Sequence, residues 1–392
     1  MSLKTLHALH IASFNGNVGD IGNHIGFRRT LEENLNRNFI YTDLEIREFY
    51  RSWNLRKFDE NFVKMANDYD LIIIGGGNFF EVAWDYSSTG TTIDISKEIL
   101  ERLKTPIFFN GVGVDDGKGV TESTINKFGS FLTSLTSSPK YIVSVRNDGS
   151  QEILRKYYPK DIIEKIYKIP DGGFFVKPKG YIHPEIAEDK KIIGINIAGD
   201  MPTIRFNPEI DETQISMDEF IKDFAVTINK LLAMDPSIHL VFIPHIIKDY
   251  EIMTRVFSCI NDVFLRTRVT VSPCLNGTVT DGSYIFDLYS KCDLTIGMRY
   301  HSNVCSIGQG IPTIGLLSYH KHIKLYEDIG LEDRVIEANK KGFAQKLLDK
   351  TVVSLASLES LKIENSQIMR KMTKETEEFH KKLDEWLKIN GL

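Results

Sequence analysis

Apolar runs alternate with amphipathic stretches along most of this 392-residue chain. In the first half, the pattern predicts strands at 6–14, 41–49, 70–74, 106–114 and 141–145, and helices at 21–35, 58–69, 93–103, 121–135 and 150–157. Strands separated by about 10 to 15 helical residues indicate βαβ units and a parallel sheet. We therefore predict an α/β, Rossmann-like domain over residues 1–180.

A second series of the same kind follows a polar, proline-containing segment at 177–191, which we interpret as a linker. Its predicted strands are 192–198, 239–244, 269–272, 294–298 and 311–317, and its predicted helices include 217–234, 249–260 and 302–309. This predicts a second Rossmann-like domain over residues 181–345. The last predicted helix, 358–389, carries apolar residues at helical spacing, namely Ile368, Met372, Phe379, Leu383 and Trp386. We expect the C-terminal helices, 346–392, to pack back on the first domain.

Composition narrows the class of protein. Hydrophobic residues make up 42% and charged residues 26%, as in globular proteins, and the net charge of −5 argues against nucleic acid as a partner. The chain shows no signal-peptide core and no run of 18 apolar residues, so we expect a cytoplasmic protein. Contact with the inner face of a membrane and self-association both stay open. The four cysteines lack zinc-site spacing and are expected to be reduced.

The segment Cys292–Lys321 carries the leading functional candidates. A buried strand ends directly before Arg299 and His301, and a helix predicted at 302–309 follows. Such residues lie at the carboxyl edge of a parallel sheet, where open α/β folds bind ligands. Arginine holds carboxylate or phosphate oxygens in pairs, and histidine exchanges protons near neutral pH. The two side chains share a face only if the extended backbone continues to His301.

Polar residues follow other predicted strands as well. Arg146 comes directly after strand 141–145, where it either contacts a ligand or caps a neighbouring helix. His245 follows Pro244, and is either part of a site or an ordinary surface histidine.

Two glycine-containing loops are further candidates. Asn17 and Asp20 flank a loop that either approaches a ligand or forms a turn with Asp20 as the helix N-cap. Gly77 and Asn78 end a three-glycine turn that is a plausible ligand-facing loop.

Several familiar motifs are absent. The chain has no G-x-G-x-x-G or Walker A sequence, no D-x-D, no G-x-S-x-G and no H-E-x-x-H. We therefore predict no metal site and no bound cofactor, with charge neutralisation by arginine, lysine and backbone amides.

Seven short segments, taken in order, resemble the polysaccharide pyruvyl transferase family over about residues 12–335. They are NVGD (17–20), DLIIIGGGNFF (70–80), SVR (144–146), PDGGF (170–174), GMRYH (297–301), GIP (310–312) and SYHK (318–321). The resemblance implies a GT-B-like architecture with the site in the inter-domain cleft. It also implies transfer of an enolpyruvyl-derived group from phosphoenolpyruvate to two hydroxyls of a sugar or lipid-linked oligosaccharide, with release of phosphate.

Arg299 and His301 match the R-x-H positions that the family associates with phosphoenolpyruvate. We hypothesise that His301 transfers the proton and Arg299 clamps the anion, with Arg146, Lys321 and Arg205 assisting. The sequence departs from the family pattern at Lys321, which stands one residue early, and after SVR, where Asn147 replaces the usual acid. Two alternatives are a GT-B glycosyltransferase that uses a nucleotide sugar and a non-catalytic relative that acts as a binding protein.

Overall fold

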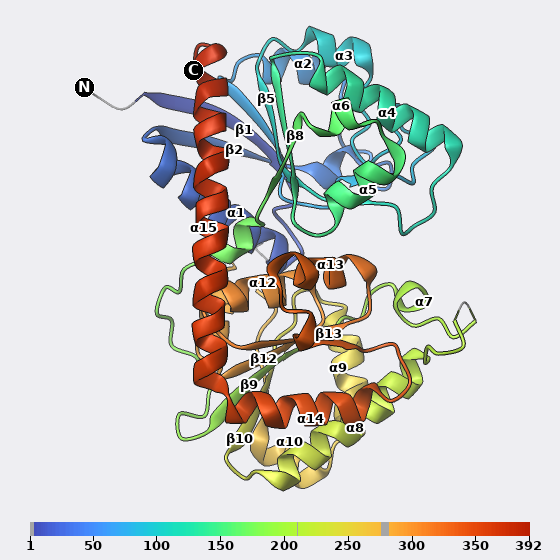
Figure 1. Ribbon diagram of the computed structural model, residues 1–392, viewed down its shortest axis with the longest axis vertical. Coiled ribbons are helices and arrows are strands. Elements are labelled where there is room, and N and C mark those ends of the chain that lie inside the picture. Colours follow the sequence, from blue (N-terminus) through green and yellow to red (C-terminus); the bar gives the residue numbers. More distant parts are fainter. Residues whose placement is uncertain (1–3, 210, 276–281) are drawn as a thin grey trace. The chain divides into compact units, whose positions relative to one another are not determined.

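The computed structural model describes residues 4–209, 211–275 and 282–392 (Figure 1). These residues form two compact units, and each unit is built on a six-stranded parallel sheet. Unit 1 contains the described residues up to Phe14, 27–172 and 372–392, and unit 2 contains 15–26 and 173–371. The predicted α/β class, the parallel sheets and the long C-terminal helix are confirmed.

The sheet of unit 1 has the strand order β2-β1-β3-β5-β7-β8. Its strands are β1 (Thr5–Ala12), β2 (Asn38–Glu45), β3 (Leu71–Gly75), β5 (Ile107–Val112), β7 (Tyr141–Arg146) and β8 (Ile166–Ile169). A short parallel pair, β4 (Phe80–Glu81) and β6 (Val114–Asp115), extends the loops at the sheet's carboxyl edge. The helices are α1 (Val18–Leu35), α2 (Glu60–Ala66), α3 (Lys97–Arg102), α4 (Glu122–Thr136), α5 (Ser150–Tyr157) and α6 (Lys160–Ile163). The predicted strand 41–49 was too long, because residues 46–49 form a 3₁₀ helix.

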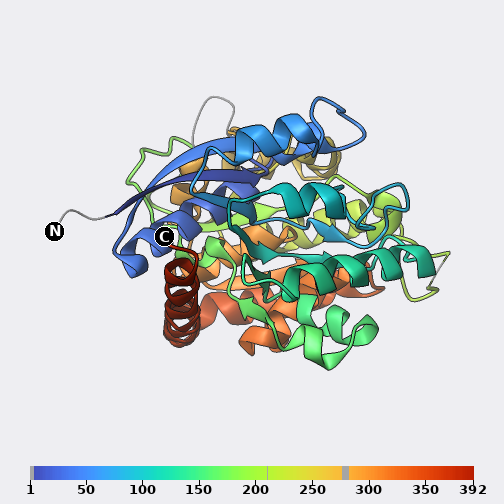
Figure 2. The same cartoon turned by 90° about the horizontal axis from the view of Figure 1, so that it is seen from above.

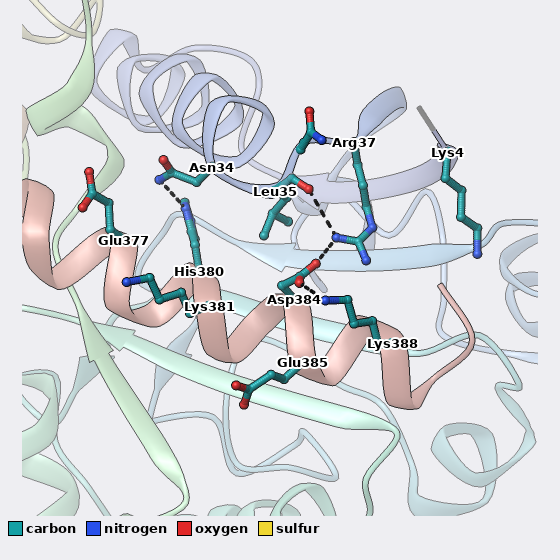
Figure 3. A pocket seen from close by; sticks show the side chains of 11 residues that line it. Lys4, Asn34, Leu35, Arg37, Glu377, His380, Lys381, Asp384, Glu385 and Lys388 are labelled. Atoms are coloured by element: carbon teal, nitrogen blue, oxygen red, sulfur yellow. Dashed lines mark hydrogen bonds and ion pairs between the residues drawn. The ribbon is translucent and has the colours of Figure 1, made fainter. Parts of the chain in front are cut away.

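Alternation along the strands of unit 1 sends side chains to two separate cores. Ile72 and Ile74 of β3 lie in the core beneath α2, α3 and α4, whereas Ile73 lies in the core beneath α1 and α15 (Leu358–Ile389) (Figure 2). Four C-terminal residues of α15 join that second core, namely Phe379, Leu383, Trp386 and Leu387. Docking of this part of the helix on the first sheet agrees with its predicted amphipathic face.

The sheet of unit 2 has the order β11-β10-β9-β12-β13-β14. Its strands are β9 (Lys191–Asn196), β10 (Ile238–Phe242), β11 (Val269–Val271), β12 (Leu294–Gly297), β13 (Thr313–Leu317) and β14 (Val335–Glu337). Its helices are α7 (Pro202–Arg205), α8 (Met217–Met234), α9 (Asp249–Phe257), α10 (Asp262–Arg268), α11 (Ser283–Tyr289), α12 (Tyr300–Gly308), α13 (His320–Ile329) and α14 (Phe343–Ala356). One apolar core lies under α8, α9 and α14, and the other lies under α11 and α12.

The two units differ from the predicted domains at three places. The N-terminal part of the first unit ends at Gly172 rather than at residue 180, and residues 15–26, which include the start of α1, belong to unit 2. Helix α14 was expected on the first domain, but its Phe343 and Leu347 pack in the unit 2 core. The division between the units then falls within α15, after Lys371.

Two further observations concern the chain as a whole. Cys259, Cys274, Cys292 and Cys305 form no disulfide in the described part of the chain. Among the described residues, no helix combines the length and the apolar character needed to cross a membrane.

Candidate functional site

The chain turns sharply after β12, and this turn places Arg299 and His301. Asn196 of β9 supports it, because its backbone carbonyl accepts from Met298 N at 2.9 Å and its Oδ1 accepts from Arg299 N at 3.0 Å. Helix α12 then begins at Tyr300, two residues before the predicted start at Ser302. The extended backbone therefore ends at Arg299, and His301 lies in the first helical turn.

The guanidinium of Arg299 is buried and bound by two carboxylates. Its Nε donates to Asp249 Oδ2 at 2.8 Å, and its Nη2 donates to Asp249 Oδ1 at 2.5 Å and to Asp200 Oδ1 at 2.9 Å. This bidentate pair fixes the plane of the guanidinium. Nη1 has no acceptor among the described residues, so it is the part of Arg299 that remains for a ligand.

Asp249, the first residue of α9, joins three loops of unit 2. Besides Arg299, its carboxylate accepts from the backbone N–H groups of Gly199 at 3.1 Å, His245 at 2.9 Å and Ile246 at 3.2 Å. Burial alone would raise the pKa of this carboxyl, but the charge of Arg299 and these hydrogen bonds hold the pKa below its usual value. Asp249 is therefore an anion that orients Arg299.

Arg205 shares the second carboxylate of this cluster. It is buried, and its Nε donates to the carbonyl of Asp200 at 3.1 Å, while its Nη1 donates to Ser318 Oγ at 3.2 Å, just after β13. Its Nη2 lies 3.4 Å from Asp200 Oδ1, which also accepts from Arg299. The cluster thus combines two arginines with two aspartates, so it supplies oriented donors rather than a large net positive charge.

His301 packs against the start of α1. A Cβ added to Gly19 would lie 2.5 Å from His301 Nδ1, so only glycine leaves room for the ring. The N-cap of α1 is Asn17 and not Asp20 as predicted, since the helix begins at Val18 and Asn17 Oδ1 accepts from Gly19 N at 3.0 Å. Asn17 Nδ2 also donates to Asp20 Oδ2 at 3.2 Å, which closes this turn.

His245 lies beside the same turn and is fully buried, not on the surface. Its carbonyl accepts from Val18 N at 3.0 Å, and its Nε2 lies 2.7 Å from the hydroxyl of Tyr289. Burial, together with the charge of Arg299, lowers the pKa of His245 to about 3. The imidazole is therefore neutral near pH 7 and supports the turn without supplying charge.

Two helices begin at the ends of neighbouring strands of the unit 2 sheet. Helix α12 follows β12 and α13 follows β13, and neither Arg299 nor Tyr319 caps its helix through its side chain. Helix N-termini carry partial positive charge, which attracts anions. Lys321, in the first turn of α13, is buried near this edge and adds a cation.

Unit 1 has a second cluster at the carboxyl edge of its own sheet. Arg146 ends β7, and its Nε donates to Asp148 Oδ2 at 2.7 Å while its Nη1 lies 3.6 Å from Asp171 Oδ2. Gly113 lies beside both Arg146 and Asn78: a Cβ built on it would be 2.6 Å from Asn78 Oδ1 and 3.0 Å from Arg146 Nη2. The side chains of Asn78 and Arg146 are therefore close together.

The three-glycine turn forms the wall of this second cluster. Gly77 accepts from Gly113 N at 2.8 Å, and Asn78 Nδ2 donates to Asp115 Oδ2 at 2.9 Å. Unit 1 therefore brings together the predicted residues Arg146, Gly77 and Asn78. It also surrounds the arginine with Asp148 and Asp171, which were not among the predicted site residues.

The family model for polysaccharide pyruvyl transferase matches residues 1–321. The chain belongs to this family. A sequence comparison with curated proteins gives no match.

Three solved structures share the fold. A putative UDP-N-acetylglucosamine 2-epimerase from Listeria monocytogenes has a TM-score of 0.52 at 11% identity, over 94% of this chain and 91% of its own. Trehalose-6-phosphate synthase OtsA has a TM-score of 0.51 at 12% identity, over 98% of this chain and 99% of its own. The S. aureus MnaA–UDP structure has a TM-score of 0.50 at 11% identity, over 93% of this chain and 91% of its own. At these identities the likeness shows a GT-B-like fold alone.

Sequence reasoning missed the acids that hold the arginines, above all Asp200, Asp249 and Asp171. Asp249 carried a usable signal, since it opens a predicted helix shortly after a predicted strand and so belongs at the carboxyl edge of the sheet. Asp200 and Asp171 lie in irregular segments without periodicity, and the only signal for Asp171 was its place in the PDGGF segment.

Proposed function

We propose that this protein transfers the pyruvyl group of phosphoenolpyruvate to two hydroxyls of a sugar in a surface or exopolysaccharide precursor, forming a cyclic ketal. Membership of the polysaccharide pyruvyl transferase family carries this proposal. The unit 2 cluster supports it, because a small dianion needs several converging donors at one place. Arg299, the cation of Lys321 and the positive ends of the α12 and α13 dipoles all follow the adjoining strands β12 and β13.

In the proposed reaction, a sugar hydroxyl attacks C2 of phosphoenolpyruvate while the methylene carbon C3 takes up a proton from His301. The proton of the attacking hydroxyl returns to the imidazole. A second hydroxyl then attacks C2 as the C2–O bond to phosphate breaks, and its proton leaves with the phosphate. One phosphoenolpyruvate and one diol thus give one ketal and one phosphate.

In this proposal Arg299 clamps the anionic donor through directed hydrogen bonds. Asp249 and Asp200 offset the charge of Arg299, so we propose that Arg299 contributes directed hydrogen bonds to the carboxylate or phosphate of the donor. Lys321 and the helix N-termini then add positive potential at the same edge of the sheet. We also propose that turnover needs no metal or cofactor, so that it continues in EDTA.

Phosphate release measured with phosphoenolpyruvate and a panel of saccharide acceptors tests the reaction. We expect release with an acceptor that carries two suitably placed hydroxyls, and loss of release in His301→Gln with an unchanged melting temperature. Near-normal turnover of His301→Gln would refute its role in proton transfer.

Thermal shifts test the donor independently of the acceptor. A ligand present at one hundred times its dissociation constant adds about 2.7 kcal/mol of stability. Phosphoenolpyruvate should raise the melting temperature, and a nucleotide such as UDP should not. The opposite result would favour a glycosyltransferase, and no shift with either ligand would favour a non-catalytic relative.

A further inference from the structure

The turn between β2 and α2 in unit 1 presents two apolar side chains to solvent. We define the apolar turn as residues 50–57, drawn as the blue loop beyond α2 in Figure 2. Trp53 is 48% exposed and Leu55 is 69% exposed. The indole N–H of Trp53 donates to no acceptor among the described residues.

The apolar turn is held in this shape by backbone hydrogen bonds within it and to the preceding 3₁₀ helix. The N–H groups of Trp53 and Asn54 both donate to the carbonyl of Tyr50, at 3.0 and 2.7 Å. Those of Leu55 and Arg56 both donate to the carbonyl of Glu48, at 3.0 and 2.8 Å.

Asn54 has a φ of +50°, a left-handed conformation that asparagine tolerates better than most residues. The turn therefore projects Trp53 and Leu55 as a preformed tip, and little conformational entropy is lost when a partner covers them.

Cationic side chains flank the tip. Arg51 lies over the ring of Tyr86, 5.2 Å from its centroid, and Tyr86 is itself 42% exposed. Arg56 pairs with Glu48, whereas Arg51 and Lys57 have no carboxylate partner in the described part of the chain. Two exposed, unpaired cations beside an apolar tip match the outer layer of an anionic bilayer, where phosphates lie above hydrocarbon.

We propose that the apolar turn is a membrane-docking element, with Trp53 and Leu55 entering the headgroup region and Arg51 and Lys57 contacting lipid phosphates. Tryptophan suits this boundary, because its ring is apolar and its N–H still finds water or lipid oxygens. The element goes beyond the proposed reaction, since lipid binding requires neither donor nor acceptor. Its chemistry would bring the protein to an anionic membrane surface.

Vesicle sedimentation of the full chain tests the proposal. Vesicles of phosphatidylcholine alone are compared with vesicles in which a third of the lipid is phosphatidylglycerol. We expect the double variant Trp53→Ser/Leu55→Ser to bind both vesicles at least about tenfold more weakly than the wild type. Val263→Ser, which removes an equally exposed apolar side chain on α10, should bind like the wild type.

The contribution of the two cations and the insertion of Trp53 into the bilayer are tested by separate measurements. Each cation near an anionic surface increases the affinity for that surface about fivefold. The double variant Arg51→Gln/Lys57→Gln should therefore bind the anionic vesicles roughly 25-fold more weakly than the wild type. Its binding to vesicles of phosphatidylcholine alone should be unchanged. Lys165→Gln, at an exposed lysine outside the turn, is the matched control. Tryptophan fluorescence should shift to shorter wavelength on adding vesicles, and Trp53→Phe should abolish that shift.

Two results would overturn the proposal. One is wild-type protein that stays in the supernatant with anionic vesicles at low salt. The other is a dimer in light scattering that Trp53→Ser/Leu55→Ser converts to a monomer, which would make the turn a contact between two copies. Because all of the substituted side chains are exposed, melting temperatures should remain unchanged, and phosphate release with a water-soluble acceptor should be unaffected.

Discussion

Replacement of Asp249 by asparagine tests the unit 2 cluster most directly. The carboxylate has no exposed surface, and it accepts two hydrogen bonds from Arg299 and three from backbone N–H groups. Asparagine keeps the size but offers only one oxygen and adds an NH₂ group. In Asp249→Asn, that NH₂ group must face donors, and Arg299 keeps Asp200 as its remaining counter-ion.

The structure sets the expected magnitude. Removing one partner of a buried ion pair costs about 3–5 kcal/mol. Asp200 Oδ1 still lies 2.9 Å from Arg299 Nη2. We therefore expect Asp249→Asn to lower the free energy of unfolding by about 3 kcal/mol, the lower end of this range. Urea denaturation followed by circular dichroism at pH 7 measures the loss. Asp262→Asn breaks an exposed pair with Arg266 on α10 and should change the free energy by less than about 0.5 kcal/mol.

The stability lost in Asp249→Asn should depend on pH. Arg299 and the backbone donors keep the folded-state pKa of Asp249 below its usual value, although burial opposes this. Such a group stabilises the fold above its unfolded-state pKa, about 4, and this stabilisation is lost as the pH falls through the lower folded-state pKa. The difference between wild type and Asp249→Asn should therefore narrow below about pH 4. Equal stabilities at pH 7 would refute the reasoning.

Three further substitutions test other parts of the structure. In Gly19→Ala, the new Cβ would lie 2.5 Å from His301 Nδ1. We therefore expect the free energy of unfolding to fall by about 1–3 kcal/mol and phosphate release to slow. Normal phosphate release would show that the position of the His301 ring is not critical. Leu383→Ala removes a buried side chain of α15 from unit 1 and should cost about 2–5 kcal/mol by denaturation, whereas the neighbouring exposed Lys382→Ala should cost almost nothing. Arg146→Gln removes the cation that Asp148 and Asp171 contact and should cost about 3–5 kcal/mol, so an unchanged melting temperature would contradict the ion pairs of unit 1.

Elements with a strong internal pattern were predictable. The run of apolar residues in β3 and the helical spacing of Phe379 and Leu383 in α15 both follow from burial of a repeating face, which is a local property of the sequence. The short edge strands β8 and β14 were missed, because three or four residues carry too little periodicity.

The amino-acid sequence by itself determined the α/β class, the two parallel sheets and the position of Arg299 at the end of a strand with His301 close behind it, since each depends on residues close together in the chain. Tertiary structure alone decided which acids surround the arginines. Arg299 and Asp249 are 50 residues apart, and Gly19 meets His301 only because the start of α1 packs in unit 2. Charge pairing depends on distance in space, and no local pattern records that distance. The sequence therefore located the candidate cations, and only the folded chain determined which carboxylates orient them.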